Sequence, residues 1–188
     1  ISLGVRPGHR VAMWHNDTAA IHVLLVAVER CGAAVIGLGA RTGVREAAQI
    51  LRTAEPALLV CDPDRRASAT EVTQRVVVFG DGADVEIDTR PGAEAGLAPI
   101  GADDVFLINS TSGTTGLPKC VVHTQNRWHY FHQKAVANGR LTSDDVFLPV
   151  IPTPFGFGIW TSHTTPIHLG ASTVRIDRFD AAATCAAI

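Results

Sequence analysis

Short, nearly continuous apolar segments recur along the chain, separated by polar or glycine-containing stretches. Uninterrupted apolar character over a few residues, rich in β-branched side chains, is typical of strands covered on both faces of a sheet. We therefore predict strands over residues 9–14, 34–38, 57–62, 75–79, 104–108, 119–123 and 172–176.

Several of the intervening segments carry apolar residues at helical spacing instead. From Ile21 to Cys31 the pattern predicts a helix, with Asn16 or Asp17 as its N-cap and Gly32 at its end. Strands that alternate with helices indicate an α/β fold, in which layers of mostly parallel sheet are flanked by helices. The remaining predictions are helices over 45–53 and 125–137, and a long surface connection over 80–104 that is rich in Gly, Ala, Pro and Asp.

Composition narrows the class of protein. The 188 residues suit one domain or a little more, and the 46% that are hydrophobic allow a sizeable core and exclude a disordered chain. The formal net charge of −2 offers no basic surface for nucleic acid, and no apolar run reaches the ~18 residues of a membrane span. The four cysteines form no CxxC pair, so neither a disulfide framework nor a zinc site is expected, and the expected location is cytoplasmic.

One polar tract stands between two of the predicted strands. Residues 109–124 read NSTSGTTGLPKCVVHT. Gly113 and Gly116 allow main-chain N–H groups to crowd around a ligand, and Lys119 adds a positive charge. Hydroxyl donors come from Ser110, Thr111, Ser112, Thr114 and Thr115. Together these groups suit a polyphosphate, such as the β- and γ-phosphates of ATP.

The tract is not a Walker A loop. Its order of Gly113, Gly116 and Lys119 does not match GxxxxGK[ST]. Pro118 disfavours helical geometry at Leu117, and the apolar run that follows favours a strand. We therefore predict a glycine-rich loop over residues 111–118 that joins two strands. A Gly/Thr-rich surface hairpin without a ligand is the alternative interpretation of the composition alone.

TSGTTGLPK (residues 111–119) resembles the signature phosphate loop of the adenylate-forming enzymes, a superfamily of acyl-CoA synthetases, luciferases and peptide-synthetase adenylation domains. His123 and Asn126 fit the sequence that usually follows this loop. The resemblance implies that residues 1–188 are an incomplete N-terminal domain of an AMP-dependent synthetase or ligase, without the family's C-terminal domain. Further stretches that resemble successive blocks of that domain are residues 4–17, 24–38 and 145–160.

The family catalyses two steps, and the resemblance implies the same here. A carboxylate oxygen attacks the α-phosphate of ATP and releases pyrophosphate, and a thiol, usually that of coenzyme A, then displaces AMP from the acyl-adenylate. The implied small molecules are ATP, Mg2+, coenzyme A and a small carboxylic acid; the oligomeric state is not indicated. Lys119 is the implied catalytic residue. The implied nucleotide-binding residues are Thr111, Ser112, Gly113, Thr114, Thr115, Gly116 and Lys119.

Two positions depart from the family's usual pattern. Cys120 stands where glycine is common, and we interpret it as a small strand residue with a negative φ rather than a reactive thiol. Phe155 stands where many acyl-CoA synthetases have a histidine that lines the acyl channel. Phe155 and Gly158 are therefore candidate substrate-binding residues, with ordinary core packing as the alternative for Phe155. No metal site is expected, because His129 and His132 have no third ligand nearby in the sequence.

Two other functions stay open. A peptide-synthetase adenylation domain would pass the acyl group to a carrier protein, and a nucleotide-binding remnant would have no turnover. Sequence beyond Ile188 would discriminate among these functions, because the family's later blocks hold the adenine, ribose and magnesium contacts.

Overall fold

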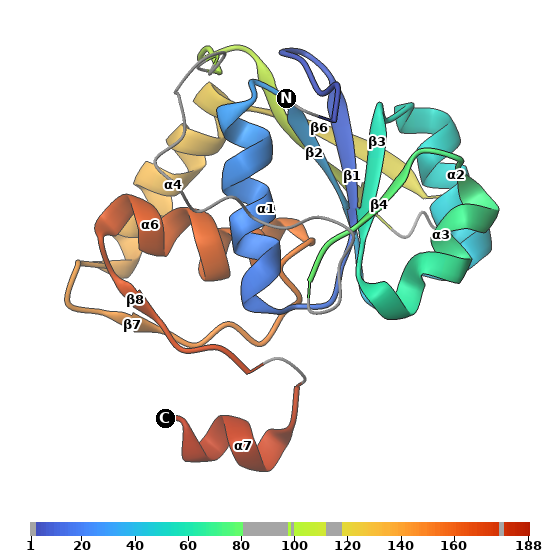
Figure 1. Ribbon diagram of the computed structural model, residues 1–188. Helices are drawn as coiled ribbons and strands as arrows, with labels where there is room; N and C mark the ends of the chain where they lie inside the picture. Colours follow the sequence, from blue (N-terminus) through green and yellow to red (C-terminus); the bar gives the residue numbers. More distant parts are fainter. Residues whose placement is uncertain (1–2, 81–97, 99, 112–117, 177–178) are drawn as a thin grey trace, which may run out of the picture.

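A six-stranded sheet forms the centre of the protein (Figure 1). The structure is a computed structural model that describes residues 3–80, 98, 100–111, 118–176 and 179–188. The strands of the sheet lie in the order β4-β3-β1-β2-β5-β6. Their bounds are Arg10–Trp14 (β1), Ala34–Leu38 (β2), Leu58–Cys61 (β3), Val76–Val78 (β4), Val105–Thr111 (β5) and Lys119–Thr124 (β6).

Neighbouring strands of this sheet run parallel except β5 and β6, which are antiparallel. Every residue of β2 and β3 is buried, as expected for strands covered on both faces. The predicted α/β fold with a mostly parallel sheet is confirmed. A second, small sheet pairs β7 (Val146–Phe147) with β8 (Ser172–Thr173) in parallel.

Helices cover both faces of the central sheet (Figure 1). One face carries α1 (Ala19–Arg30), α4 (Gln125–Gly139) and α6 (Thr165–Leu169), and the other carries α2 (Val44–Ala54) and α3 (Arg66–Val72). The remaining helices are η1 (Pro63–Arg65), α5 (Gly156–Ile159), the π-helical η2 (Trp160–Thr164) and α7 (Ala181–Ala186). Within the described part of the chain, no helix has both the length and the apolar character needed to cross a membrane.

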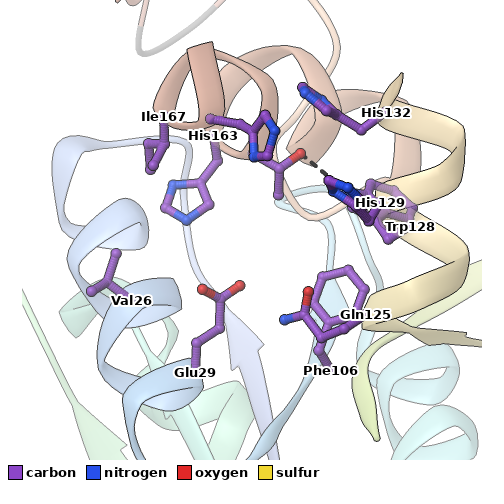
Figure 2. A pocket seen from close by; sticks show the side chains of 11 residues that line it. Val26, Glu29, Phe106, Gln125, Trp128, His129, His132, His163 and Ile167 are labelled. Atoms are coloured by element: carbon purple, nitrogen blue, oxygen red, sulfur yellow. Dashed lines mark hydrogen bonds between the residues drawn. The ribbon is translucent and has the colours of Figure 1, made fainter. Parts of the chain in front are cut away.

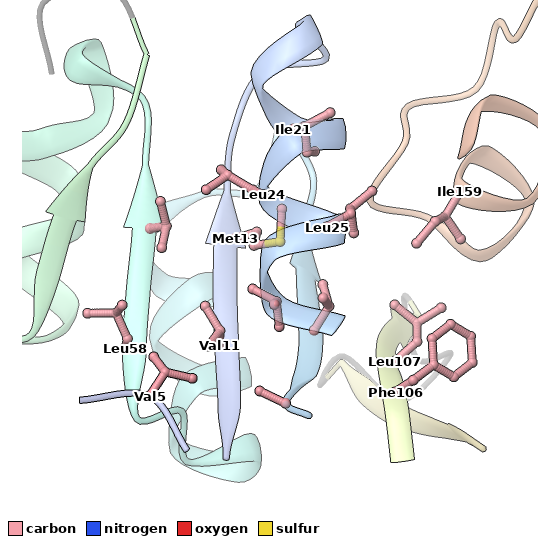
Figure 3. Packing of buried hydrophobic residues seen from close by; sticks show 14 of the residues in the cluster. Val5, Val11, Met13, Ile21, Leu24, Leu25, Leu58, Phe106, Leu107 and Ile159 are labelled. Carbon is pink, nitrogen blue, oxygen red and sulfur yellow. The ribbon is translucent and has the colours of Figure 1, made fainter. Parts of the chain in front are cut away.

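The sheet divides the core into two clusters, one on each face. On the face of α1, Leu24 and Leu25 pack against Val11 and Met13 of β1, as Figure 3 shows. On the opposite face, residues of α2 such as Ile50 pack with the strand side chains that point away from α1. Burial of each large aliphatic side chain contributes roughly 1.5–3 kcal/mol, so the two clusters hold the strand ends, and any site built on them, in fixed positions.

The helix predicted from Ile21 to Cys31 corresponds to α1, and Gly32 ends it at a φ of +67°. Its predicted N-cap is wrong. The N-cap position is Thr18, whose side chain forms no capping hydrogen bond, while Asp17 accepts hydrogen bonds from Thr153 instead. A partner far along the chain therefore outcompetes the local cap.

Two other elements differ from the prediction. The sequence pattern does not reveal η1 and α3, because Ala69 is the only residue of the pair that is buried. The strand predicted over 172–176 is limited to β8. Most of the predicted connection over 80–104 lies outside the described residues.

Candidate functional site

The glycine- and threonine-rich tract connects two neighbouring strands at the edge of the sheet. β5 ends at Thr111, β6 begins at Lys119, and these two residues are partners in the antiparallel register. The prediction that the tract joins two strands is confirmed by these flanks. The predicted site residues Ser112, Gly113, Thr114, Thr115 and Gly116 lie outside the described residues.

Thr111 and Lys119 are both exposed at the carboxyl end of β5. No described carboxylate forms an ion pair with the Lys119 ammonium group. Ligands of α/β sheets bind outside the carboxyl ends of the strands, and an exposed ammonium group beside a hydroxyl suits an anionic ligand. The described flanks of the tract therefore offer a place for a phosphate group.

Cys120 follows Lys119 in β6 and is the register partner of Ser110. Its φ is negative as predicted, since Glu55 and Arg140 are the only described non-glycine residues with a positive φ. Its side chain packs against the cluster on the α2 face. Burial raises the pKa of the Cys120 thiol, which disfavours the reactive thiolate. The packing agrees with a small strand residue.

The segment of residues 151–160 lies against the carboxyl ends of β2 and β5. A Cβ atom on Gly37 of β2 would lie 2.3 Å from the carbonyl oxygen of Pro154. A Cβ atom on Gly156 would lie 2.6 Å from Nδ2 of Asn109 in β5. Both distances are too short for a real side chain, so these glycines allow the segment to lie directly on the sheet. It therefore covers β5 just before the strand reaches Thr111.

The two predicted substrate-binding residues of this segment differ in exposure. Phe155, the N-cap residue of α5, is 39% exposed. Its ring lies over Gly39, where an added Cβ would be 2.8 Å from the ring Cζ. Phe155 therefore belongs to neither buried core cluster of the described residues. Gly158 is buried, and a Cβ atom there would lie 1.9 Å from the carbonyl oxygen of Pro152, so packing alone requires glycine.

Asn109 is a candidate that sequence reasoning misses. Asn109 is only 6% exposed, and no described group donates a hydrogen bond to its buried Oδ1 atom. A buried polar atom without a partner costs about 1–3 kcal/mol. Asn109 lies two residues before Thr111, so its Oδ1 is a candidate ligand contact. A lone amide after the apolar run of β5 is the signal that could have revealed it.

A polar network fixes the position of the 151–160 segment. The carboxylate of Asp17 accepts a hydrogen bond from the Thr153 backbone N–H at 3.2 Å and another from the Thr153 hydroxyl. That hydroxyl lies 3.0 Å from the hydroxyl of Ser162, and Arg175 forms an ion pair with Asp17 at 3.9 Å. Because Thr153 is fully buried, these bonds set where the neighbouring Phe155 ring can lie.

A second network joins the loops that follow β1, β3 and β4. His15 Nδ1 lies 3.0 Å from Asp62 Oδ1, and His15 Nε2 lies 3.0 Å from the carbonyl oxygen of Phe79. Burial lowers the pKa of His15, but the hydrogen bonds to Asp62 and to the carbonyls of Asn16 and Phe79 outweigh it, so the pKa is raised. Both ring nitrogens face oxygen acceptors, which favours a doubly protonated imidazolium.

Arg65 extends this network. Its guanidinium group lies 3.8 Å from Asp62, donates a hydrogen bond to the carbonyl of Ala40 after β2, and lies 5.4 Å from the Trp14 ring centre. We call His15, Asp62 and Arg65 the strand-end network. Asp62 and Arg65 are three residues apart, but His15 lies 47 positions before Asp62 in the sequence, so local sequence patterns do not reveal the network.

The histidines of α4 belong to a cavity. His129 and His132 line a cavity together with His163 and His168 (Figure 2). Within the described residues, no group of three His, Cys, Asp or Glu side chains is arranged to hold a metal ion.

Known proteins resemble the whole of this chain. A family model described as "AMP-binding enzyme" matches residues 1–188. A "3-[(3aS,4S,7aS)-7a-methyl-1,5-dioxo-octahydro-1H-inden-4-yl]propanoyl:CoA ligase" of Mycobacterium tuberculosis is 34% identical, over 96% of this chain and 39% of the relative. Two solved structures are each 27% identical. ATP-bound MatB from Rhodopseudomonas palustris has a TM-score of 0.81 over 95% of this chain and 37% of its own. Apo MbtA from Mycobacterium smegmatis has a TM-score of 0.85 over 99% of this chain and 37% of its own. The chain thus spans at most 39% of the length of these relatives.

Proposed function

Because the chain belongs to the family of AMP-binding enzymes, we propose that the full-length protein activates a carboxylic acid with ATP and transfers the acyl group to coenzyme A. The observation that carries the proposal is the exposed pair of Thr111 and Lys119, which bounds the glycine-rich tract at the carboxyl end of β5. Residues 1–188 would then belong to the large N-terminal domain of a longer ligase.

In the proposed first step, a carboxylate oxygen forms a bond to the α-phosphorus of ATP while the bond to pyrophosphate breaks. The tract from Thr111 to Lys119 would bind the β- and γ-phosphates. The Lys119 ammonium group would offset the charge that develops on the leaving pyrophosphate, since fixed positive charge favours such a transition state. In the second step, the sulfur of coenzyme A bonds to the acyl carbon and AMP leaves.

Magnesium belongs to the proposal as a partner of ATP. Mg2+ is usually held by one or two protein oxygen ligands together with substrate phosphates and water. The described residues near the tract fit only the smaller part of that set, through the hydroxyl of Thr111 and the amide oxygen of Asn109. We therefore propose that the phosphates of ATP supply most of the ion's ligands, where the ion would reduce their negative charge.

The acid is proposed to be apolar. Phe155, whose ring lies over Gly39 just after β2, is 39% exposed, and Phe157, two residues further on, is 57% exposed. In this proposal the two rings form an apolar wall of the acid site. The M. tuberculosis relative supports this class, because its name gives a largely hydrocarbon bicyclic propanoyl group. A role in the metabolism of fatty or other apolar acids, in the reducing environment of the cytoplasm, is part of the same proposal.

The test is acid-dependent exchange of labelled pyrophosphate into ATP, measured on the full-length protein with a panel of straight-chain, aromatic and fused-ring carboxylic acids. We expect exchange with apolar acids, and an acyl-CoA product detected by mass spectrometry once coenzyme A is added. Exchange without a CoA product, but with loading of a carrier protein, would instead identify an adenylation domain. ATP binding without exchange for any acid would contradict the proposed ligase activity.

A further inference from the structure

A cavity of about 360 Å³ lies between α1, α4, η2 and α6, on the face of the sheet that carries α1. We call it the histidine pocket. It is lined by Val26, Glu29, Phe106, Gln125, Trp128, His129, His132, His163, Thr164, Ile167 and His168. Phe106 and Thr111 are five residues apart in β5, so the pocket and the glycine-rich tract are separated by about 17 Å along the strand. The pocket is therefore distinct from the proposed ATP site.

Among the described residues that line the pocket, Glu29 carries the only carboxyl group. Its side chain extends from α1 into the cavity, toward the side from which His163 extends (Figure 2). No described Lys, Arg or His lies within ion-pair distance of its carboxylate. Burial raises the pKa of Glu29 to about 7. A carboxyl group that is desolvated beside a cavity and lacks a charged partner is a candidate ligand contact.

The His132 and His163 imidazoles favour the neutral form, in which one ring nitrogen can accept a hydrogen bond. His132 Nδ1 lies 3.2 Å from the hydroxyl of Thr165, and His163 Nδ1 lies 3.0 Å from His22 Nδ1. Burial lowers the pKa of both His132 and His163, that of His163 to about 4. When Nδ1 of a neutral ring donates, its Nε2 keeps a lone pair that can accept a hydrogen bond.

An aromatic wall completes the lining. The Nε1–H of Trp128 donates to the hydroxyl of Thr164 at 3.2 Å, which fixes the orientation of the ring. Aromatic rings attract a cation placed over their face. None of the described lining residues is a lysine or arginine, so none of them would pair with a phosphate or carboxylate ligand.

We propose that the histidine pocket binds a small organic ammonium ion, with Glu29 as its counter-ion, histidine nitrogens as hydrogen-bond acceptors and Trp128 as an aromatic wall. The volume falls within the usual range for small-molecule sites, about 300–1,000 Å³. A bare metal ion fits less well, because the described side chains offer no group of three suitably arranged ligands. The inference is independent of the proposed ligase activity.

The test is isothermal titration of the full-length protein with n-butylammonium, and with 1-butanol as an uncharged probe of similar size. At about pH 8 an alkylammonium ion remains charged, since amines of this kind titrate near 10, while Glu29 is mostly ionised. We expect n-butylammonium to bind with a dissociation constant of about 1 mM and 1-butanol to bind at least tenfold more weakly. Equal affinity for the two probes, or no binding of n-butylammonium, would overturn the proposal.

Two variants assign the binding to this pocket. Glu29→Gln keeps the shape of the side chain and removes its charge, so affinity for n-butylammonium should fall by roughly tenfold or more. Glu71→Gln changes an exposed glutamate of α3 on the other face and should have no effect. Ile167→Arg places a cation at a lining position that is 62% exposed and therefore tolerant of change; it should abolish binding. Unchanged affinity in both Glu29→Gln and Ile167→Arg would place the ligand elsewhere and overturn the assignment.

Discussion

The carboxyl ends of β1, β3 and β4 differ from the carboxyl end of β5 in how their polar side chains are satisfied. In the strand-end network, His15 and Asp62 are buried and bonded to each other; His15 also lies within hydrogen-bond distance of the Phe79 carbonyl, and Asp62 accepts a hydrogen bond from the Asn16 backbone N–H. At the end of β5, Thr111 and Lys119 are exposed, and Asn109 has a buried oxygen without a described partner. Both regions lie at the same edge of one sheet.

This difference separates groups that hold the fold from groups available to a ligand. Buried polar atoms must be hydrogen-bonded within the protein, otherwise they destabilise it. Polar atoms at a strand end that are exposed, or that have no partner within the protein, do not stabilise the fold in this way. Substitutions in the strand-end network should therefore reduce folding stability, while substitutions at Lys119 should reduce activity alone.

Asp62→Asn should have the largest effect on folding. The substitution leaves the buried imidazolium of His15 without its counter-charge, and breaking a buried pair in this way costs roughly 3–5 kcal/mol. Urea denaturation gives the free energy of unfolding. Asp64→Asn, at an exposed position two residues further on, should change it by less than about 0.5 kcal/mol. A similarly small change for Asp62→Asn would remove the structural role assigned to the network.

Gly158→Ala should destabilise the segment beside the site. The added Cβ would lie 1.9 Å from the carbonyl oxygen of Pro152, so the backbone must shift, and overpacking of this kind costs about 1–3 kcal/mol. Thermal unfolding measures the loss. Gly43→Ala is the matched control, since no atom lies within 4 Å of its added Cβ. If both variants melted at the wild-type temperature, the close packing of α5 on Pro152 would be refuted.

The buried histidines should respond to pH in opposite directions. An exposed histidine titrates near 6.5, and the pKa of His15 is raised above this value in the folded protein. Its stabilising contribution is thus present below about pH 6.5 and is lost as pH rises through the folded pKa. The free-energy difference between wild type and His15→Gln should therefore be larger at about pH 6 than at about pH 8.

His163 provides the contrasting case. Burial and the neighbouring His22 lower its pKa to about 4, so its contribution is present above about pH 6.5 and is lost as pH falls toward 4. The difference between wild type and His163→Asn should be larger at about pH 6.5 than at about pH 4.5. Urea denaturation at the four pH values checks both histidines, and parallel trends for the two variants would contradict the assigned protonation states.

Phe155→Ala should have a smaller effect on folding and a clear effect on specificity. A buried phenylalanine costs roughly 3–5 kcal/mol when trimmed to alanine, but Phe155 is 39% exposed, so we expect about 1 kcal/mol. If its ring bounds the acyl site, kcat/KM should shift by roughly tenfold toward bulkier acids. An unchanged acid preference across the panel would remove Phe155 from that site.

Local patterns predict most of the scaffold. The strands β1, β2 and β3 follow from continuous apolar runs, because almost all of their residues are buried between the helices on the two faces. β5 and β6 follow from shorter apolar runs, although β6 lies at the edge of the sheet and has no buried residue. The α3 helix does not follow, since Ala69 is its only buried residue and its pattern carries little apolar periodicity. It packs against α2 in the structure.

The site is predictable only in part. The glycine, hydroxyl and lysine composition of residues 111–119 marks the tract because such chemistry is concentrated in a short stretch. His15 and its partner Asp62 are 47 positions apart in the sequence, and Asp17 and its partner Thr153 are 136 positions apart. Such pairs depend on strand order and register, which a single sequence does not specify.

The most direct test of the nucleotide site is Lys119→Ala in the full-length protein. Loss of a charge-assisted hydrogen bond of roughly 1.5–3 kcal/mol should lower the rate of ATP–pyrophosphate exchange by about tenfold to a hundredfold. The free energy of unfolding should stay within about 0.5 kcal/mol of wild type, because Lys119 is exposed. Lys134→Ala, which changes the only other lysine of this sequence, should leave exchange unaltered. Wild-type exchange in Lys119→Ala would contradict the assignment of the tract as the ATP site.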